Sequence, residues 1–475
     1  MSGSKSTPWY RDKEFFEGVM RIGMPVALQN LMTSTLSMID SMMIGSVGET
    51  SLAAVGMAGQ WGSLLFSAYW GLCCGGTMFF SQYWGAGDIK GIRRAFSVTL
   101  MSMMAVGLIF CLLALLAPAW VLAIYTNDPD VQRQGAQYLQ IMSVGYLAQV
   151  ASMAMSGLLR STENVKLPLF ASLASIATNT FVNWLLIYGN WGLPALGVRG
   201  AAIASVLAAF VNLLIILGAS ASQGNVLMGA LRRVLHIEWR FIGEFFRKSS
   251  PIIANELFYG FAVMAINMVM GRQGAANLSA LTVFRTLEGL IFAFFGGLSN
   301  ASSVMVGKSI GAGELDKGLR DAKRFALLCP AMSFLVCLVV LALRRPIVGL
   351  FGVSGSVAAT VMSMLMIYTV TAPMRTSNYI QVNIFRSGGE TRMGMFLEVG
   401  GIWLVGVPLV YLTGMVWHLP FLAIFVMFYV EDAIKCFIEP LYLASGRWIR
   451  PVTPQGQAAL AAFRDQRKRR RGRAA

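Results

Sequence analysis

Twelve predominantly apolar stretches divide this chain, each of about 20 residues, the length that an α-helix needs to cross the hydrocarbon core of a bilayer. Of the 475 residues, 56% are apolar and only 13% are charged, a balance that soluble domains of this size do not show. The sequence therefore predicts an all-α polytopic membrane protein with twelve transmembrane helices. These helices begin near residues 19, 52, 94, 134, 167, 198, 244, 276, 322, 360, 393 and 419.

Lysine and arginine are distributed unequally between alternate loops. With a cytoplasmic amino terminus, the cytoplasmic segments hold 30 of the 38 basic residues, the external loops hold 5 and the helices hold 3. Such an excess is typical of cytoplasmic loops. We therefore expect a multi-pass protein of the plasma (inner) membrane with both termini in the cytoplasm. Its basic tail is then expected to lie near anionic lipid, and no nucleic-acid partner is expected.

The second half of the chain repeats the first at one constant offset, the offset that carries Pro25 onto Pro251. At this offset the loop sequence WGAGDIKGIRRA falls on IGAGELDKGLRDA, with one residue inserted after the glycines. A second single insertion places Glu163 on Glu390. Because each copy holds an even number of helices, both copies should enter the membrane in the same sense, as in transporters built from parallel repeats.

The repeat gives the chain two lobes that carry different acids. Asp40 falls opposite Ile266, and Glu256 falls opposite Asn30. We therefore expect the lobes to share a scaffold but not a chemistry. The predicted segments are a cytoplasmic amino-terminal segment (1–18), an N-lobe of helices one to six (19–220), a cytoplasmic inter-lobe loop (221–243), a C-lobe of helices seven to twelve (244–443) and a basic cytoplasmic tail (444–475).

Asp40 is the one charged residue between Ile22 and Gly48. A carboxylate at the centre of a membrane helix costs roughly 2.5 to 3.5 kcal/mol on insertion scales, and such residues usually mark ion or substrate pathways. Asn179 and Asn183 are spaced i, i+4, so their side chains share a helix face and could offer two carbonyl oxygens to one point. Interhelical hydrogen bonding is the alternative for this pair.

Other ionisable residues also lie at membrane depth. Glu256 comes eight residues after Lys248, about 12 Å into its helix. Arg285 and Glu288 are spaced i, i+3 and can neutralise one another, which leaves Glu288 as a secondary site candidate. The whole set is net negative and would favour cations. It contains Asp40, Glu256, Glu288, Glu398, Glu431 and Asp432 against Arg285, Arg375 and Lys435, with Glu431 and Lys435 as a further possible pair.

Several segments together resemble one transporter family. They are PVALQNLMTSTLSMIDSMMIGSVGETSLAAVG, the GAGD and GAGE loops, LLRSTENVKLP and NTFVNWLLIYGNWGLPALGVRGAAIAS, spread over residues 15–443. In order and spacing they resemble the multidrug and toxic compound extrusion (MATE) transporters, within the wider multidrug, oligosaccharidyl-lipid and polysaccharide flippase superfamily. The resemblance implies a V-shaped pair of six-helix lobes that alternates access and exports cationic, amphipathic compounds in exchange for Na⁺ or H⁺.

The resemblance also implies roles for particular residues. Asp40 matches the first-helix acid of the family's amino-terminal site, and Asn179 and Asn183 match its fifth-helix polar pair. Together these three could hold Na⁺. Glu256 resembles the seventh-helix acid of many bacterial members. Some relatives carry an acid at the position of Asn183 or on the tenth helix, where residues 368–385 have none, so the coupling ion stays open.

We expect a monomeric transporter and not an enzyme, with organic cations and lipid as partners. No cofactor is expected beyond the coupling ion. VGKS at residues 306–309 lacks the first glycine of a phosphate loop, since residue 302 is Ser302. Two alternatives stay open. A flippase for a lipid-linked or polysaccharide precursor would need a cationic cavity, and a non-transporting receptor or scaffold would not need intramembrane acids.

Overall fold

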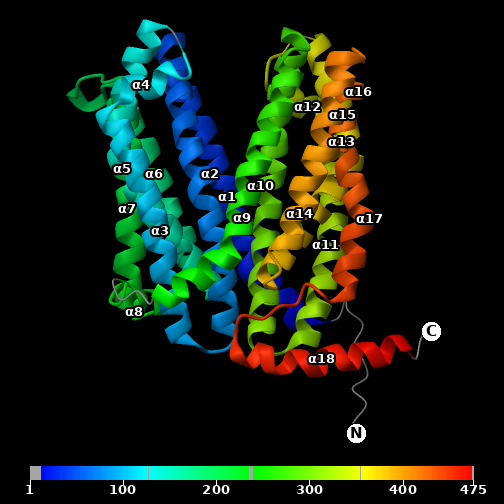
Figure 1. The fold of residues 1–475 in the computed structure, drawn as a ribbon. Helices are drawn as coiled ribbons and strands as arrows, with labels where there is room; N and C mark the ends of the chain where they lie inside the picture. The colour runs from blue at the N-terminus through cyan, green and yellow to red at the C-terminus, as the bar shows by residue number, and fades with distance from the viewer. Residues whose placement is uncertain (1–11, 127, 235–238, 354, 473–475) are drawn as a thin grey trace. The chain divides into compact units, whose positions relative to one another are not determined.

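The structure is a computed structural model that describes residues 12–126, 128–234, 239–353 and 355–472. Five parts of the predicted segments lie outside the described residues: 1–11 of the amino-terminal segment, 127 of the N-lobe, 235–238 of the inter-lobe loop, 354 of the C-lobe and 473–475 of the tail. Throughout the described residues the regular secondary structure is helical, with no strand (Figure 1). The all-α prediction is therefore confirmed.

Each of the twelve predicted spans is helical. The first repeat contains α1 (Lys13–Gly45), α2 (Glu49–Gly85), α3 (Ile89–Leu116), α4 (Pro118–Ala123), α5 (Pro129–Ser161), α6 (Lys166–Tyr188), the 3₁₀ turn η2 (Asn190–Gly192), α7 (Val198–Gln223) and α8 (Val226–Leu231). The second contains α9 (Trp239–Gly271), α10 (Ala275–Gly311), α11 (Leu315–Ala342), α12 (Arg344–Gly349), α13 (Gly355–Ser387), α14 (Arg392–Gly401), the π-helical turns η3 (Ile402–Gly406) and η4 (Leu412–Val416) around α15 (Val407–Tyr411), α16 (Phe421–Phe428), α17 (Val430–Ser445) and the tail helix α18 (Pro454–Gly472).

The helix bounds repeat at the offset that carries Pro25 onto Pro251. At this offset, each of α1 to α5 begins and ends at the same positions as the corresponding helix of α9 to α13. The start of α6 likewise falls on the start of α14. The two single insertions that we expected are therefore wrong. Glu163 and Gly389 both have positive φ, at 64° and 89°, just after the ends of α5 and α13. Glu163 thus occupies the place of Gly389 and not that of Glu390, because backbone geometry rather than side-chain type sets the register at a helix end.

Most helices begin several residues before the predicted start. The first turns of these helices are polar, so they fell outside the apolar stretches from which the starts were predicted. The α3 helix begins at Ile89 because the Asp88 carboxylate accepts the Gly91 N–H at 2.8 Å. At the start of α5, Pro129 stands at the first helical position and Asp128 accepts the Asp130 N–H at 2.9 Å.

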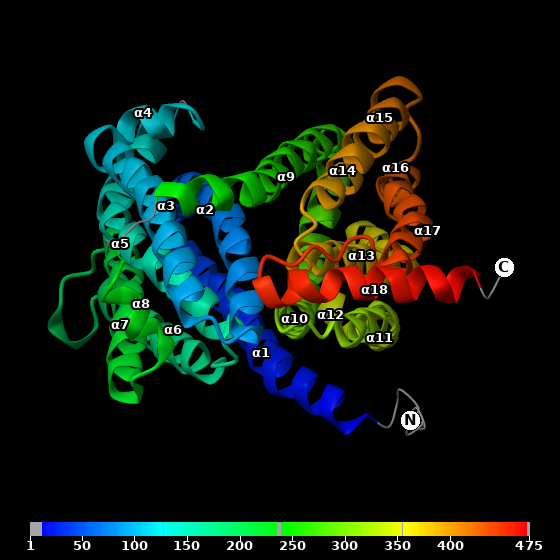
Figure 2. The same cartoon turned by 60° about the horizontal axis from the view of Figure 1, so that its bottom comes forward.

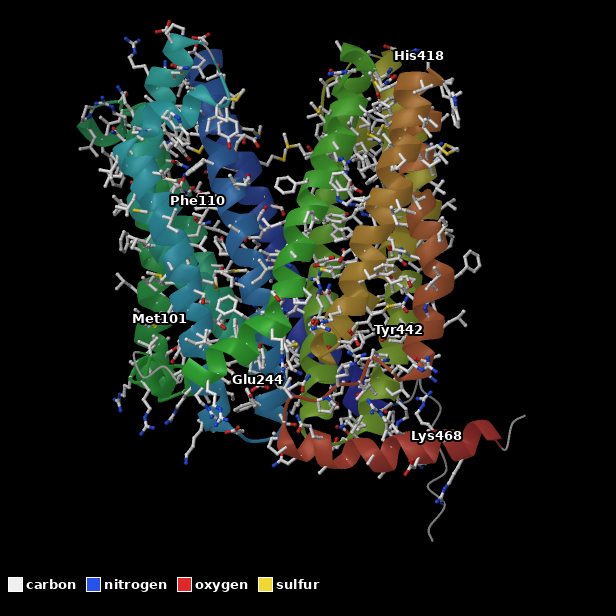
Figure 3. All side chains as sticks on the ribbon, viewed as in Figure 1. Met101, Phe110, Glu244, His418, Tyr442 and Lys468 are labelled. Carbon is white, nitrogen blue, oxygen red and sulfur yellow. The ribbon has the colours of Figure 1, made fainter. Side chains whose placement is uncertain are left out.

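The lengths and surfaces of the helices suit a membrane. By length and composition, ten helices of the described residues could cross a bilayer, and α1 and the α16–α17 pair correspond to the other two predicted spans. Large apolar side chains remain exposed along these helices, Met101 on α3 among them, whereas Lys468 projects from the tail helix (Figure 3). The chain is a multi-pass membrane protein.

The described chain divides into two compact units that do not follow the repeat at three places. The amino-terminal unit contains Leu28–Phe80 and Asp88–Glu256. The carboxy-terminal unit contains Leu257–Ala475, Ser81–Gly87 and the chain up to Ala27. The first half of α1 and the end of α2 therefore belong to the unit of the second repeat, and the first half of α9 belongs to the unit of the first.

Close helix contacts at repeated positions hold these exchanged halves. In the amino-terminal unit, a Cβ at Gly71 on α2 would stand 2.8 Å from the Ile253 Cα on α9. In the carboxy-terminal unit, a Cβ at Gly297 on α10 would overlap the Ala27 backbone nitrogen on α1. The repeat places Gly71 on Gly297 and Ala27 on Ile253, so the two pairs are equivalent. Small residues that let helix backbones approach are common in membrane bundles, and here they form the same contact twice.

The ends of the two repeats differ. The single helix α6 of the first repeat corresponds to α14, η3, α15 and η4 in the second, so two π-helical turns interrupt the ordinary hydrogen-bond pattern there. After α17, the chain packs α18 against the ends of α10 and α11 within the carboxy-terminal unit (Figure 2). The Thr453 hydroxyl donates to the Gly311 carbonyl at 2.7 Å and fixes this connection.

Candidate functional site

Asp40 lies in a polar cluster inside the amino-terminal unit. The Asn183 side-chain N–H group on α6 donates to Asp40 Oδ1 on α1 at 2.7 Å and to Asn179 Oδ1 at 3.0 Å. The Asn179 amide in turn donates to the Ser205 hydroxyl on α7 at 3.2 Å. Asn179 and Asn183 are buried and share one face of α6, as their spacing predicted. Three helices therefore contribute to one hydrogen-bonded chain that ends on the carboxylate.

A cavity of about 260 Å³ opens beside this carboxylate. Asp40, Asn183, Tyr138 and Ser205 line it together with residues of α1, α2 and α7, and its lining contains no Lys or Arg. Within the described residues Asp40 makes no ion pair, so only neutral donors stabilise its charge. A half-buried carboxylate of this kind gains most from a proton or a small cation.

The asparagine pair differs from the arrangement that we expected. Asn179 Oδ1 is occupied by the Asn183 N–H group, so the two carbonyl oxygens do not converge on one point. The free acceptor is instead Asn183 Oδ1, which is buried and has no hydrogen-bond partner in the described structure. The reason is that Asp40 and Asn179 Oδ1 are both acceptors and draw the amide N–H group toward themselves. Carboxylate and amide oxygens suit Na⁺, but the Na⁺ site stays a prediction.

Glu256 lies on α9 and is not part of the polar cluster around Asp40. It is the last residue of the amino-terminal unit, it is partly exposed, and it does not line the Asp40 cavity. The structure therefore does not bring Glu256 together with Asn179 and Asn183. Its role in coupling stays a prediction.

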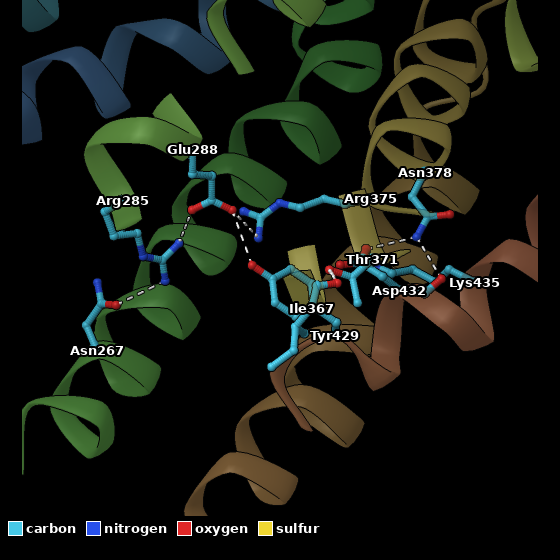
Figure 4. A network of polar contacts seen from close by, with 10 residues as sticks. All are labelled: Asn267, Arg285, Glu288, Ile367, Thr371, Arg375, Asn378, Tyr429, Asp432 and Lys435. Atoms are coloured by element: carbon cyan, nitrogen blue, oxygen red, sulfur yellow. Dashed lines mark hydrogen bonds and ion pairs between the residues drawn. The ribbon is translucent and has the colours of Figure 1, made fainter. Parts of the chain in front are cut away.

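Glu288 is surrounded by cationic and polar groups in the carboxy-terminal unit (Figure 4). Its carboxylate pairs with Arg285 at 2.8 Å and with Arg375 at 3.3 Å, and the Tyr429 hydroxyl donates to it at 3.4 Å. The predicted Arg285–Glu288 pair is confirmed. The Arg375 guanidinium also lies over the rings of Phe292, Phe428 and Tyr429. Glu288 is thus already neutralised, which favours the structural reading of this residue.

The charged residues near the start of α17 are paired as well. Lys435 lies 3.3 Å from Glu431 Oε2, which confirms the expected i, i+4 pair, and 3.9 Å from Asp432 Oδ1. The Asn378 amide on α13 donates to Asp432 Oδ1 at 2.9 Å (Figure 4). Glu398 on α14 pairs with Arg386 at 3.1 Å. Apart from Glu398, which is partly exposed, all of these residues are buried.

Sequence reasoning missed Glu439 as an intramembrane acid. It lies four residues after Lys435 on α17 and is 0% exposed. The spacing of Glu431, Lys435 and Glu439 at i, i+4 and i+8 would have shown that all three lie on one helix face. The pairing of Arg386 with Glu398 was also missed, since it joins two helices.

Comparisons with known proteins agree with this architecture. The MatE family profile matches the chain twice, at residues 25–185 and 251–412. A "Probable multidrug resistance protein NorM" of Bradyrhizobium diazoefficiens is 26% identical over 404 residues, covering 83% of this chain and 85% of that protein. "Multidrug resistance protein MdtK" of Edwardsiella ictaluri is 22% identical over 404 residues, covering 84% and 87%.

Solved structures share the fold. The Vibrio cholerae MATE transporter VcmN has a TM-score of 0.80 at 16% identity, covering 91% of this chain and 97% of that one. A MOP superfamily transporter from Pyrococcus furiosus has a TM-score of 0.80 at 16% identity, covering 91% and 95%. A helical repeat that matches the MatE profile in each half, with relatives that are named as multidrug resistance proteins, identifies a membrane transporter and not an enzyme. The chain belongs to the MatE family.

Proposed function

We propose that the protein exports organic, mainly cationic amphipathic compounds in exchange for Na⁺ or H⁺ by alternating access. The observation that carries the proposal is the Asp40 carboxylate, which faces a cavity of about 260 Å³ and has only neutral partners. Relatives named as multidrug resistance proteins support a multidrug substrate range.

Competition for one carboxylate accounts for exchange. A proton or Na⁺ on Asp40 would neutralise it, with Asn183 Oδ1 as a further oxygen for Na⁺. The neutral site attracts a cationic substrate less strongly, so ion binding favours substrate release. A ligand shifts a conformational equilibrium only through different affinities for the two states, and loss of the charge supplies that difference.

The residues that line the cavity also distinguish between the alternative functions, namely a cation exporter, a flippase and a non-transporting scaffold. A flippase for a lipid-linked phosphate would need cationic groups around its substrate, whereas this lining contains Asp40 and no Lys or Arg. A non-transporting scaffold would not need an acid at a cavity inside the membrane. Cation export therefore accounts best for the site.

Transport can be tested in proteoliposomes loaded with a fluorescent cationic dye. Sodium and proton gradients are imposed separately, and dye efflux is measured for each. We expect one gradient to drive efflux and the other to have little effect. Failure of both gradients to drive efflux of any cationic dye would reject the proposal.

We further propose that the protein lies in the inner membrane with both termini in the cytoplasm. The split of 30 cytoplasmic to 5 external basic residues supports this orientation. In a variant without the six native cysteines, a cysteine introduced beside Asp128 should react with an impermeant thiol reagent in whole cells. One beside Lys317 should react only after lysis, and the reverse pattern would invert the orientation.

A further inference from the structure

Glu439 is a buried acid that the Asp40 mechanism does not use. It is 0% exposed on α17, and neither of its carboxylate oxygens has a hydrogen-bond partner in the described structure. Other acids at membrane depth in the carboxy-terminal unit have partners: Glu288, Glu398, Glu431 and Asp432 each lie within 4 Å of an arginine or lysine. Glu439 is the exception in this cluster.

The charged groups that act electrostatically on Glu439 are already engaged. They are Glu431, Asp432 and Lys435 on its own helix and Glu398 on α14. Lys435 pairs with Glu431 at 3.3 Å, and the Arg386 guanidinium of α13 pairs with Glu398 at 3.1 Å. With every group ionised, Glu439 and these three acids would share Lys435 and Arg386. Arg375 also acts on Glu431 and Asp432, but it is paired with Glu288 at 3.3 Å.

The backbone of η3 and its neighbours packs closely against Glu431 on α17. A Cβ at Gly401 would stand 3.1 Å from Glu431 Oε2, and one at Gly406 would stand 3.6 Å from the Glu431 Cδ. Both glycines border the π-helical turn η3, so the backbone there lies directly against the charged face of α17. For a carboxylate as buried as Glu439 and without hydrogen-bond donors, the ionised form is strongly disfavoured relative to the protonated form.

We propose that Glu439 is a second proton-binding site, and that Lys435 controls its occupancy by pairing with either Glu431 or Glu439. Lys435 lies one helical turn from each glutamate. In the structure Lys435 pairs with Glu431 and leaves Glu439 without a cation. In this arrangement we assign the proton to Glu439. When Lys435 moves to Glu439, the carboxyl O–H bond breaks and its proton passes to water. Glu431, now without its cation, takes up a proton from water.

This site deepens the proposed ion-coupled export and rests on it for its use in transport, but proton binding at Glu439 can be measured without transport. Infrared difference spectroscopy of the protein in nanodiscs detects the C=O stretch of protonated carboxyls. Working in the Asp40→Asn background removes any contribution from Asp40. We expect the added Glu439→Gln substitution to remove a protonated-carboxyl band at neutral pH and to bind about one proton fewer on titration.

A matched control and a second variant make the assignment specific. Glu390→Gln replaces an equally buried glutamate that pairs with Arg450 at 2.6 Å, so it should leave the band unchanged. Lys435→Gln should increase the band, because Glu431 then loses its cation as well. If Glu439→Gln leaves the band unchanged, or if Lys435→Gln does not alter it, Glu439 is not the proton site.

Transport then separates this inference from the proposed function. With an otherwise wild-type chain, Glu439→Gln should reduce efflux driven by a proton gradient while binding of the dye persists. Loss of efflux in Asp40→Asn together with normal efflux and an unchanged band in Glu439→Gln would overturn the Glu439 site alone. A protein that no ion gradient drives would overturn the export proposal, and the infrared band would still decide whether Glu439 carries a proton.

Discussion

The two units hold their buried acids in opposite ways. Asp40 in the amino-terminal unit accepts from an amide and faces a cavity, whereas Glu288 in the carboxy-terminal unit pairs with two guanidinium groups. The repeat does not copy either arrangement, since Ile266 stands at the position of Asp40 and Gly62 at that of Glu288. A carboxylate with neutral partners can exchange a cation with solution. One that is already paired stabilises the unit instead.

The strongest test of this comparison removes the charge at Asp40. Asp40→Asn keeps the size of the side chain and should abolish gradient-driven cation export, because neither ion can then neutralise the site. Dye efflux under both gradients measures the effect, with insertion checked by size-exclusion chromatography. Asp130→Asn is the matched control, since Asp130 is exposed and its one ion pair among the described residues is with Arg133. Wild-type efflux by the Asp40→Asn protein would show that Asp40 does not couple transport, and its position inside the membrane would then have no functional explanation.

Glu256 shows whether the Asp40 cluster is sufficient by itself. Glu256 is outside the Asp40 cavity, and Asn30 occupies its repeat position. We expect Glu256→Gln to reduce efflux sharply without the complete loss expected for Asp40→Asn. Normal efflux in a well-expressed Glu256→Gln protein would show that Asp40 alone couples transport.

The sequence predicted the twelve helices, the repeat and the shared face of Asn179 and Asn183. These features depend on local composition, apolar period and spacing. The contact of Asp40 with Asn183 joins α1 and α6, and only the family resemblance suggested it. The direction in which each amide points could not be predicted, because it depends on acceptors contributed by other helices.

Other features could not be predicted because no local pattern encodes them. The exchange of the first halves of α1 and α9 depends on which apolar faces meet, and apolar faces of membrane helices look alike in sequence. The π-helical turns at η3 and η4 occur in an apolar run that also suits an ordinary α-helix. Glu439 was visible in the sequence, but its lack of partners depends on where Lys435 points.

The carboxy-terminal side of the comparison predicts a loss of stability. Arg375→Gln removes one of the two cations that neutralise Glu288 and the cation that lies over Phe292. Removing one partner of a buried pair costs about 3 to 5 kcal/mol when the other charge is left unpaired, whereas exposed pairs are worth about 0 to 1 kcal/mol. Arg285 still pairs with Glu288 after this substitution, so the loss should lie between these two ranges. Thermal unfolding in detergent should therefore show a clear loss for Arg375→Gln and little change for Arg133→Gln, whose ion pair is exposed.

A double substitution tests whether Arg375 and Glu288 act as a pair. The loss of stability in the double variant Arg375→Gln with Glu288→Gln should be smaller than the sum of the losses in the two single variants, because each single substitution already breaks the Arg375–Glu288 pair. If the loss in the double variant equals that sum, the two residues do not act as a pair.

The smallest expected effect tests how far the neutral partners of Asp40 matter. Ser205→Ala removes the acceptor of the Asn179 N–H group, which lies 3.2 Å away, and so loosens the hydrogen-bonded chain that holds Asn183 against Asp40. One hydrogen bond contributes about 0.5 to 1.5 kcal/mol, so the affinity for the coupling ion should fall roughly two- to tenfold. Half-maximal efflux as a function of ion concentration measures this fall. Ser67→Ala is the control, because the Ser67 hydroxyl is exposed and donates only within its own helix. Equal affinities in the two variants would mean that Asp40 binds its ion without help from the asparagines, and the neutral cluster would then serve packing alone.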